Sequence, residues 1–149
     1  MRFEEPELGG THMRIDGRCH CGAISYEAEV NPENVVICHC TDCQTISGAP
    51  YRVNVPVMLS KFHVLGAPKP YRKVGDSGNV VVTNFCSECG TALYSHRGEA
   101  PTFVFLRVGS VRQRADLSPK AQGFCQSAMP WAMDIRDVRQ IPARPPTAP

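Results

Sequence analysis

Seven of the eight cysteines in this 149-residue chain lie in three short clusters whose spacing is typical of metal ligands. Cys19 and Cys21 form a Cys-x-Cys pair, and Cys86 and Cys89 form a Cys-x2-Cys pair. Between them, residues 38–43 carry three thiols in six positions. The N-terminal residues lack the basic and apolar regions of a secretory signal, so we expect a cytoplasmic protein. In that reducing compartment closely spaced thiols are more often metal ligands than disulfides, and zinc is the leading candidate.

We call Cys19, Cys21, Cys86 and Cys89 the outer cluster, and we predict that it holds one structural zinc ion. Structural zinc sites are closed by four ligands arranged as a tetrahedron. Gly22 and Gly90 each follow one of the pairs. Glycine permits a positive φ, which allows backbone N–H groups to turn towards the sulfur atoms and offset their charge. The alternative for each pair is two buried, reduced cysteines without a metal.

Cys38, Cys40 and Cys43, here called the inner trio, have no fourth cysteine close in sequence. Three protein ligands with one open position are the arrangement expected of a catalytic zinc. Three thiolates leave such a site with a net charge of about −1, which favours activation of a substrate thiol over polarisation of a carbonyl. The alternative is a second closed site that a remote ligand completes; the candidates are Cys125, His63 and His96.

Two histidines lie between cysteines, and neither is expected to be a metal ligand. In extended backbone, alternate residues point to opposite faces, so His20 and His39 should point away from the sulfur atoms that flank them. His39 is either a surface or hydrogen-bonded histidine or a proton shuttle beside the open metal. The eighth cysteine, Cys125, is expected to be a small apolar residue of the core.

The rest of the sequence predicts a mainly β fold that positions these clusters. Its hydrophobic and charged fractions, 42% and 20%, are those of an ordinary globular domain. Ile24, Tyr26, Ala28 and Val30 alternate with polar residues, which predicts a half-buried strand. Further strands are predicted at 35–38, 51–57, 62–65, 80–85, 92–95 and 103–108, with Pro56 at an edge or bulge. Helix is expected only at 41–47, with Thr41 or Asp42 as the cap, and in a short turn near 116–120. The prediction is therefore a fold of short antiparallel strands with little helix.

The ends of the chain are predicted to lie outside one domain at residues 14–141. Residues 1–13 have no apolar period and indicate a flexible tail or an expression remnant, and residues 142–149 form a proline-rich tail. The formal net charge is +2, and no run of like charges occurs. This charge pattern does not favour a nucleic-acid partner, and no apolar stretch is long enough to span a membrane.

Five ordered motifs resemble one known family. They are GRCHCGA at 17–23, CHCTDC at 38–43, SGAP at 47–50, FCSECGT at 85–91 and PW at 130–131. Together they resemble the glutathione-dependent formaldehyde-activating enzyme family, also called the CENP-V/GFA domain, over about residues 14–135. The resemblance implies an Mss4-like fold with two zinc ions per chain, divided between the outer cluster and the inner trio as above. The implied activity is of the carbon–sulfur lyase type and joins glutathione and formaldehyde to S-hydroxymethylglutathione.

The resemblance also gives expectations for glutathione. Its sulfur would approach the inner trio, and we expect the loop that carries Ser47, Gly48, Ala49 and Tyr51 to wall the pocket. Candidate partners for its carboxylates are Arg52, Arg72, Lys73 and Arg97, although an exposed, solvated position is the expectation for each side chain of this type. The sequence departs from many relatives at Gln122, where they have a histidine.

Three function classes follow from these observations. The first is a zinc enzyme that acts on a small thiol and an aldehyde. The second is a non-catalytic, zinc-scaffolded module that binds glutathione or a protein. The third is a redox protein that uses Cys40 and Cys43 as a dithiol. Glutathione-dependent turnover separates the first two, and metal content separates both from the third.

Overall fold

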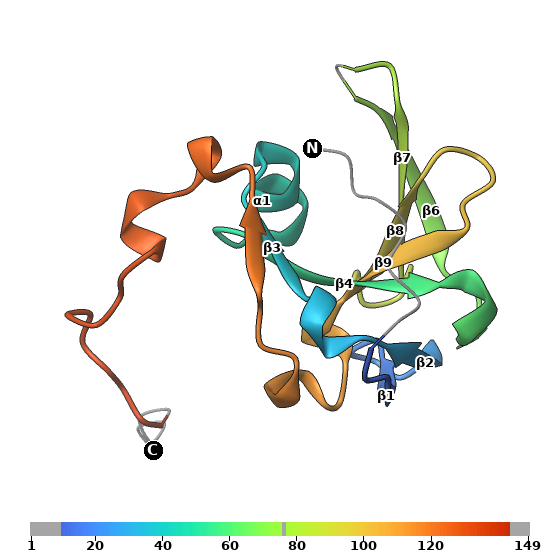
Figure 1. The fold of residues 1–149 in the computed structure, drawn as a ribbon, viewed down its shortest axis with the longest axis horizontal. Helices are drawn as coiled ribbons and strands as arrows, with labels where there is room; N and C mark the ends of the chain where they lie inside the picture. The colour runs from blue at the N-terminus through green and yellow to red at the C-terminus, as the bar shows by residue number, and fades with distance from the viewer. Residues whose placement is uncertain (1–9, 76, 144–149) are drawn as a thin grey trace.

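The structure, a computed structural model, describes residues 10–75 and 77–143, and these form two β-sheets and one α-helix (Figure 1). The smaller sheet has three antiparallel strands in the order β1 (Met13–Arg18), β2 (Ser25–Val30) and β5 (Phe62–Leu65). The order of the larger sheet is β10 (Ala121–Gly123), β3 (Val36–Cys38), β4 (Arg52–Met58), β9 (Phe103–Arg107), β8 (Ala92–Arg97), β7 (Val80–Phe85) and β6 (Lys69–Val74). Helix α1 (Thr41–Ser47) follows β3, and short 3-10 turns make up the other helical segments of this part of the chain.

The prediction of a mainly β fold is confirmed, and several elements agree with it in detail. Strands β5 and β7 and helix α1 have the predicted bounds. The predicted apolar face of β2, from Ile24 to Val30, is buried. Pro56 pairs with β9 but lies beyond the residues of β4 that pair with β3, so at this point the strand has a sheet neighbour on one side only.

Other elements differ from the predictions for physical reasons. The helix is capped by Cys40 rather than by Thr41 or Asp42, because the Cys40 sulfur accepts the N–H of Cys43 at 3.3 Å. One pair of strands, β10 and β3, is parallel. The predicted tail overlaps β1, which begins at Met13, and the rest of both tail predictions falls largely on residues 1–9 and 144–149, outside the described residues.

The core joins residues of both sheets. Ile15 and Tyr26 come from the smaller sheet, and Val55, Leu93 and Leu106 come from the larger one. Full burial of one such side chain contributes about 1.5–3 kcal/mol relative to its exposure. This packing fixes the segment after β1 against the β7–β8 loop, and the cysteines of the outer cluster lie in these two segments.

Gly17 shows how tightly the smaller sheet packs, and it gives the first test. A Cβ at this position would lie 2.2 Å from the Tyr26 hydroxyl oxygen and 2.5 Å from the Ser110 carbonyl oxygen. We expect Gly17→Ala to lower the free energy of unfolding by about 1–3 kcal/mol because the core must shift. Gly109→Ala is the matched control, since a Cβ there meets nothing within 4 Å. Urea denaturation of both variants gives the comparison, and equal stability of the two would contradict this packing.

Candidate metal centres and the cavities beside them

The outer cluster brings its four sulfur atoms together from two distant segments. All four lie within 4.8 Å of one another, and none of these cysteines forms a disulfide. The sulfur of Cys21 lies 3.5 Å from that of Cys19 and 3.7 Å from that of Cys86. Four sulfurs around one ion at about 2.3 Å would be about 3.8 Å apart, so the spacing fits a tetrahedral thiolate site.

The two halves of the outer cluster have the same local backbone. The N–H of Cys19 donates to the Ile24 carbonyl, and the N–H of Cys86 donates to the Thr91 carbonyl, each at 2.9 Å. Gly22 and Gly90 have φ values of 84° and 76°, as predicted, and an L side chain rarely adopts this conformation.

Backbone donors and Thr91 connect the two halves. The N–H of Ile24 donates to the sulfur of Cys19 at 3.2 Å, which offsets part of a thiolate's charge. The Thr91 hydroxyl lies 3.2 Å from the sulfur of Cys89 and accepts the N–H of His20 at 3.0 Å. This backbone therefore favours four thiolates at one point, and the cluster could hold a metal ion.

The inner trio lies where β3 passes into α1. Cys38 ends the strand, Cys40 caps the helix, and Cys43 lies in the first turn. Their three sulfur atoms also lie within 4.8 Å of one another and could hold a metal ion. In the part of the chain that the structure describes, no fourth ligand atom from a His, Cys, Asp or Glu joins this group.

None of the remote residues considered as a fourth ligand joins the trio's sulfur atoms, although His96 lines the same small cavity as the inner trio. Cys125 and His63 are exposed, and Nδ1 of His96 lies 3.1 Å from the Gly98 carbonyl oxygen. Cys125 also corrects the prediction of a core residue, because the chain leaves the sheet after Gly123. Phe124 has a φ of 57°, and Cys125 begins an exposed 3-10 turn.

His39 is fully buried, so the expectation of a surface position is wrong and that of a hydrogen-bonded histidine is confirmed. Its Nε2 lies 2.9 Å from the Gln122 Oε1, and its ring meets that of Tyr51 at 5.4 Å between centroids. Its Nδ1 is buried and has no hydrogen-bond partner among the described residues. Gln122 reaches it because β10 lies parallel to β3. His39 is not among the residues that line the two cavities described next.

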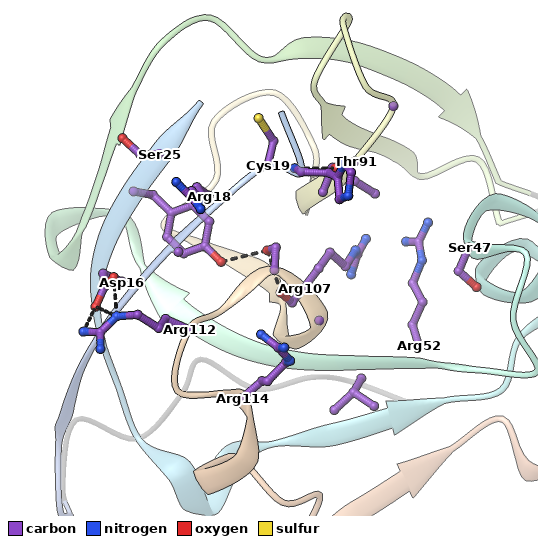
Figure 2. Close-up of a pocket in the computed structure, with 18 of the residues that line it drawn as sticks. Asp16, Arg18, Cys19, Ser25, Ser47, Arg52, Thr91, Arg107, Arg112 and Arg114 are labelled. Carbon is purple, nitrogen blue, oxygen red and sulfur yellow. Dashed lines mark hydrogen bonds and ion pairs between the residues drawn. The ribbon is translucent and has the colours of Figure 1, made fainter. Parts of the chain in front are cut away.

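Two cavities adjoin these centres. The small cavity has a volume of about 150 Å³, and the inner trio forms part of its wall. The large cavity, of about 1530 Å³, is drawn in Figure 2 and carries five arginines: Arg18, Arg52, Arg107, Arg112 and Arg114. Arg52 and Arg107 line both cavities and so connect the inner trio with the large cavity.

Only part of the loop that was expected to wall a glutathione pocket lines a cavity. Ser47 and Tyr51 line the large cavity, whereas Gly48 and Ala49 line neither of the two cavities. Gly48 has a φ of 62° and donates its N–H to the Gln44 carbonyl at 2.9 Å. It therefore ends helix α1 as a left-handed cap.

Two arginines of the cavities are buried: Arg52, which was expected to be exposed, and Arg107, which the sequence analysis did not single out. Arg52 was expected on the solvated surface, but only 6% of it is exposed, because the side of β4 that carries it is covered. Arg107 is 7% exposed, and no feature of its apolar sequence context indicated a role. Arg72, Lys73 and Arg97 are exposed. Arg72 pairs with Glu99.

These observations define a mainly β protein with two thiol-rich candidate metal centres. A family model described as glutathione-dependent formaldehyde-activating enzyme matches residues 14–127, and the chain belongs to this family. A crystal structure of a Rhodobacter sphaeroides protein has a similar fold, with a TM-score of 0.58 and 23% sequence identity. The match covers 72% of this chain and 99% of that protein. No curated protein matches the sequence. Within the described residues, no helix is both long and apolar enough to cross a membrane.

Proposed function

We propose that the chain is a zinc-dependent enzyme that joins glutathione and an aldehyde in a reaction of the carbon–sulfur lyase type. The observation that carries the proposal is the geometry of the inner trio: three sulfur donors lie together in the wall of a cavity, and no fourth ligand from the described residues joins them. Soft thiolate ligands favour zinc among the common metals. Bound there, zinc would stabilise the thiolate form of a substrate thiol, which at its free pKa of about 8.5 is mostly protonated at pH 7.

The chemistry is an addition without redox change. The sulfur–hydrogen bond of glutathione breaks, a bond forms between sulfur and the carbonyl carbon, and the carbonyl oxygen takes up a proton. The chain contributes the three cysteine ligands and the N–H of Cys43, which donates to the sulfur of Cys40. Ile46, Phe105 and Phe124 line the small cavity and would give the reacting atoms an apolar wall.

Other residues have supporting roles in this proposal. The outer cluster holds a second, structural zinc ion, which gives two per chain. The hydrogen bond between His39 and Gln122 keeps the backbone between Cys38 and Cys40 in place. The burial of His39 fits this positioning role better than a role in proton transfer. The functional unit is residues 14–141, the partners are a small thiol and an aldehyde, and the compartment is the reducing cytoplasm, where zinc-bound thiolates persist.

Exchange NMR of glutathione with formaldehyde tests this proposal directly. The two combine without an enzyme, so the signal is the acceleration of exchange between free glutathione and its adduct when zinc-loaded protein is added. We expect acceleration by the wild type and by Cys125→Ser, whose thiol is exposed and outside both clusters. If glutathione binds but exchange stays at the uncatalysed rate, the protein is a binding module rather than an enzyme.

A further inference from the structure

Arg52 and Arg107 place two buried positive charges beside one another. They lie on the adjacent strands β4 and β9, where Arg107 is directly opposite Asn54. Residues two apart on a strand share a face, so Arg52 is the diagonal neighbour of Arg107. Figure 2 shows both side chains at the large cavity, with Arg52 between Arg107 and Ser47 of helix α1. Both residues are more than nine-tenths buried.

Neither guanidinium has an anionic hydrogen-bond partner within the described residues. Arg107 donates to the Ser95 hydroxyl at 2.7 Å and to the Asn54 side-chain oxygen, and both acceptors are neutral. The Nε of Arg107 and the Nε and Nη2 of Arg52 are buried, and none of these atoms has a hydrogen-bond partner in the part of the chain that the structure describes. A buried charge without a partner is unfavourable, and two like charges side by side are more so. Burial and the charge of Arg52 lower the pKa of Arg107 to about 9.

Asp16 and Asp42, two acidic residues that line the cavities, are paired with other side chains. Asp42, in the wall of the small cavity, pairs with Lys73. In the large cavity, hydrogen bonds from Arg112 and Gln113 hold the pKa of Asp16 at about 2. Charges on the inner trio favour the positive form of Arg107, but no hydrogen bond joins either guanidinium to a trio sulfur among the residues described.

We propose that Arg52 and Arg107 together bind the carboxylate of a ligand whose reacting end lies at the inner trio. The inference rests on the proposed function and deepens it. A guanidinium presents planar pairs of N–H donors that match both oxygens of a carboxylate. The carboxylate can come from glutathione itself or from the aldehyde, which would then be a 2-oxo acid with a terminal formyl group rather than formaldehyde. Because both residues also line the large cavity, the rest of the ligand has room to extend there.

Arg52→Met is the informative variant because it removes the charge at similar length without breaking a hydrogen bond that the structure shows. We expect its melting temperature in the absence of ligand to equal or exceed that of the wild type, whereas a purely structural arginine would lower it. Arg72→Met is the control, since Arg72 is exposed and pairs with Glu99. If Arg52→Met does not fold, Arg52→Lys keeps the charge and loses the paired donors.

Two arms distinguish the sources of the carboxylate. In the first, calorimetry compares glutathione with its glycine monoethyl ester and with cysteinylglycine, each of which lacks one carboxylate. If glutathione supplies the carboxylate, one analogue binds the wild type at least about tenfold more weakly, and Arg52→Met abolishes the difference. In the second, exchange NMR compares glyoxylate with formaldehyde. If the aldehyde supplies it, Arg52→Met binds glutathione normally and loses at least about tenfold of the preference for glyoxylate.

The results that overturn the inference differ from those that overturn the proposed function. The wild type could prefer neither glutathione over its two analogues nor glyoxylate over formaldehyde, or Arg52→Met could keep the preference that the wild type shows. Either result would show that the arginine pair does not bind a carboxylate. Failure of the zinc-loaded wild type to bind glutathione removes the proposed function instead. In that case, calorimetric titration with glyoxylate alone decides the inference, and equal affinity of the wild type and Arg52→Met overturns it.

Discussion

Cys86→Ser is expected to give insoluble or zinc-poor protein, because it removes one of the four cysteines of the proposed structural zinc site, which joins distant parts of the fold. The sulfur of Cys86 is buried and lies 3.7 Å from that of Cys21. Zinc in small structural sites contributes an apparent binding free energy of about 10–16 kcal/mol. A domain of this size has a total stability of about 5–15 kcal/mol, so loss of the site should unfold it.

The measurement is zinc content by atomic absorption together with a thermal melt of the soluble fraction. Cys125→Ser is the matched control, because the same substitution at an exposed cysteine outside both clusters should leave zinc content and melting unchanged. Soluble Cys86→Ser that melts cooperatively with two zinc ions per chain would contradict the structural role of the outer cluster.

Cys43→Ala is expected to have the opposite profile: glutathione binding is lost while the fold persists. Cys43 lies in the first turn of a short helix, half-buried in the wall of the small cavity, and it is not part of the main hydrophobic core. Two remaining ligands should hold zinc poorly, so the chain should retain about one zinc ion, in the outer cluster.

Calorimetry with glutathione and a thermal melt check this second prediction. We expect no measurable heat of glutathione binding and a melting temperature within a few degrees of that of the wild type. Thr45→Ala, in the same helix but exposed and outside the lining of both cavities, is the control for an effect on the helix itself. Undiminished glutathione affinity in Cys43→Ala would show that the thiol does not bind at the inner trio.

The sequence predicted the two thiol clusters because ligand spacing is a local property. The Cys-x-Cys and Cys-x2-Cys pairs, each followed by a glycine with positive φ, form the expected turns, and all four sulfur atoms meet. Strand β2 was predictable for the same reason, since one face is buried and the alternation of Ile24 and Tyr26 with polar residues records it. Strand β6 was missed because all its residues are exposed and leave no apolar period.

The arginine pair could not be predicted, because its position depends on packing between distant strands. The alternation in β4 predicts that Val55 faces the core and that Arg52 and Asn54 face solvent. In the structure Val55 is buried in the core, but Arg52 and Asn54 are also buried, because the strand lies inside the larger sheet with both faces covered. Which residues cover the second face is a property of the topology.

Calorimetry of glutathione and S-methylglutathione, side by side in buffers of different ionisation enthalpy, tests most directly whether the glutathione sulfur lies at the inner trio. A thiol that binds there as a thiolate must release its proton. We therefore predict that binding of glutathione to the zinc-loaded protein near neutral pH releases about one proton. S-methylglutathione, which has no proton on sulfur, should bind far more weakly and release none. Equal affinity of the two compounds, with no proton released, would contradict the account and favour a binding module.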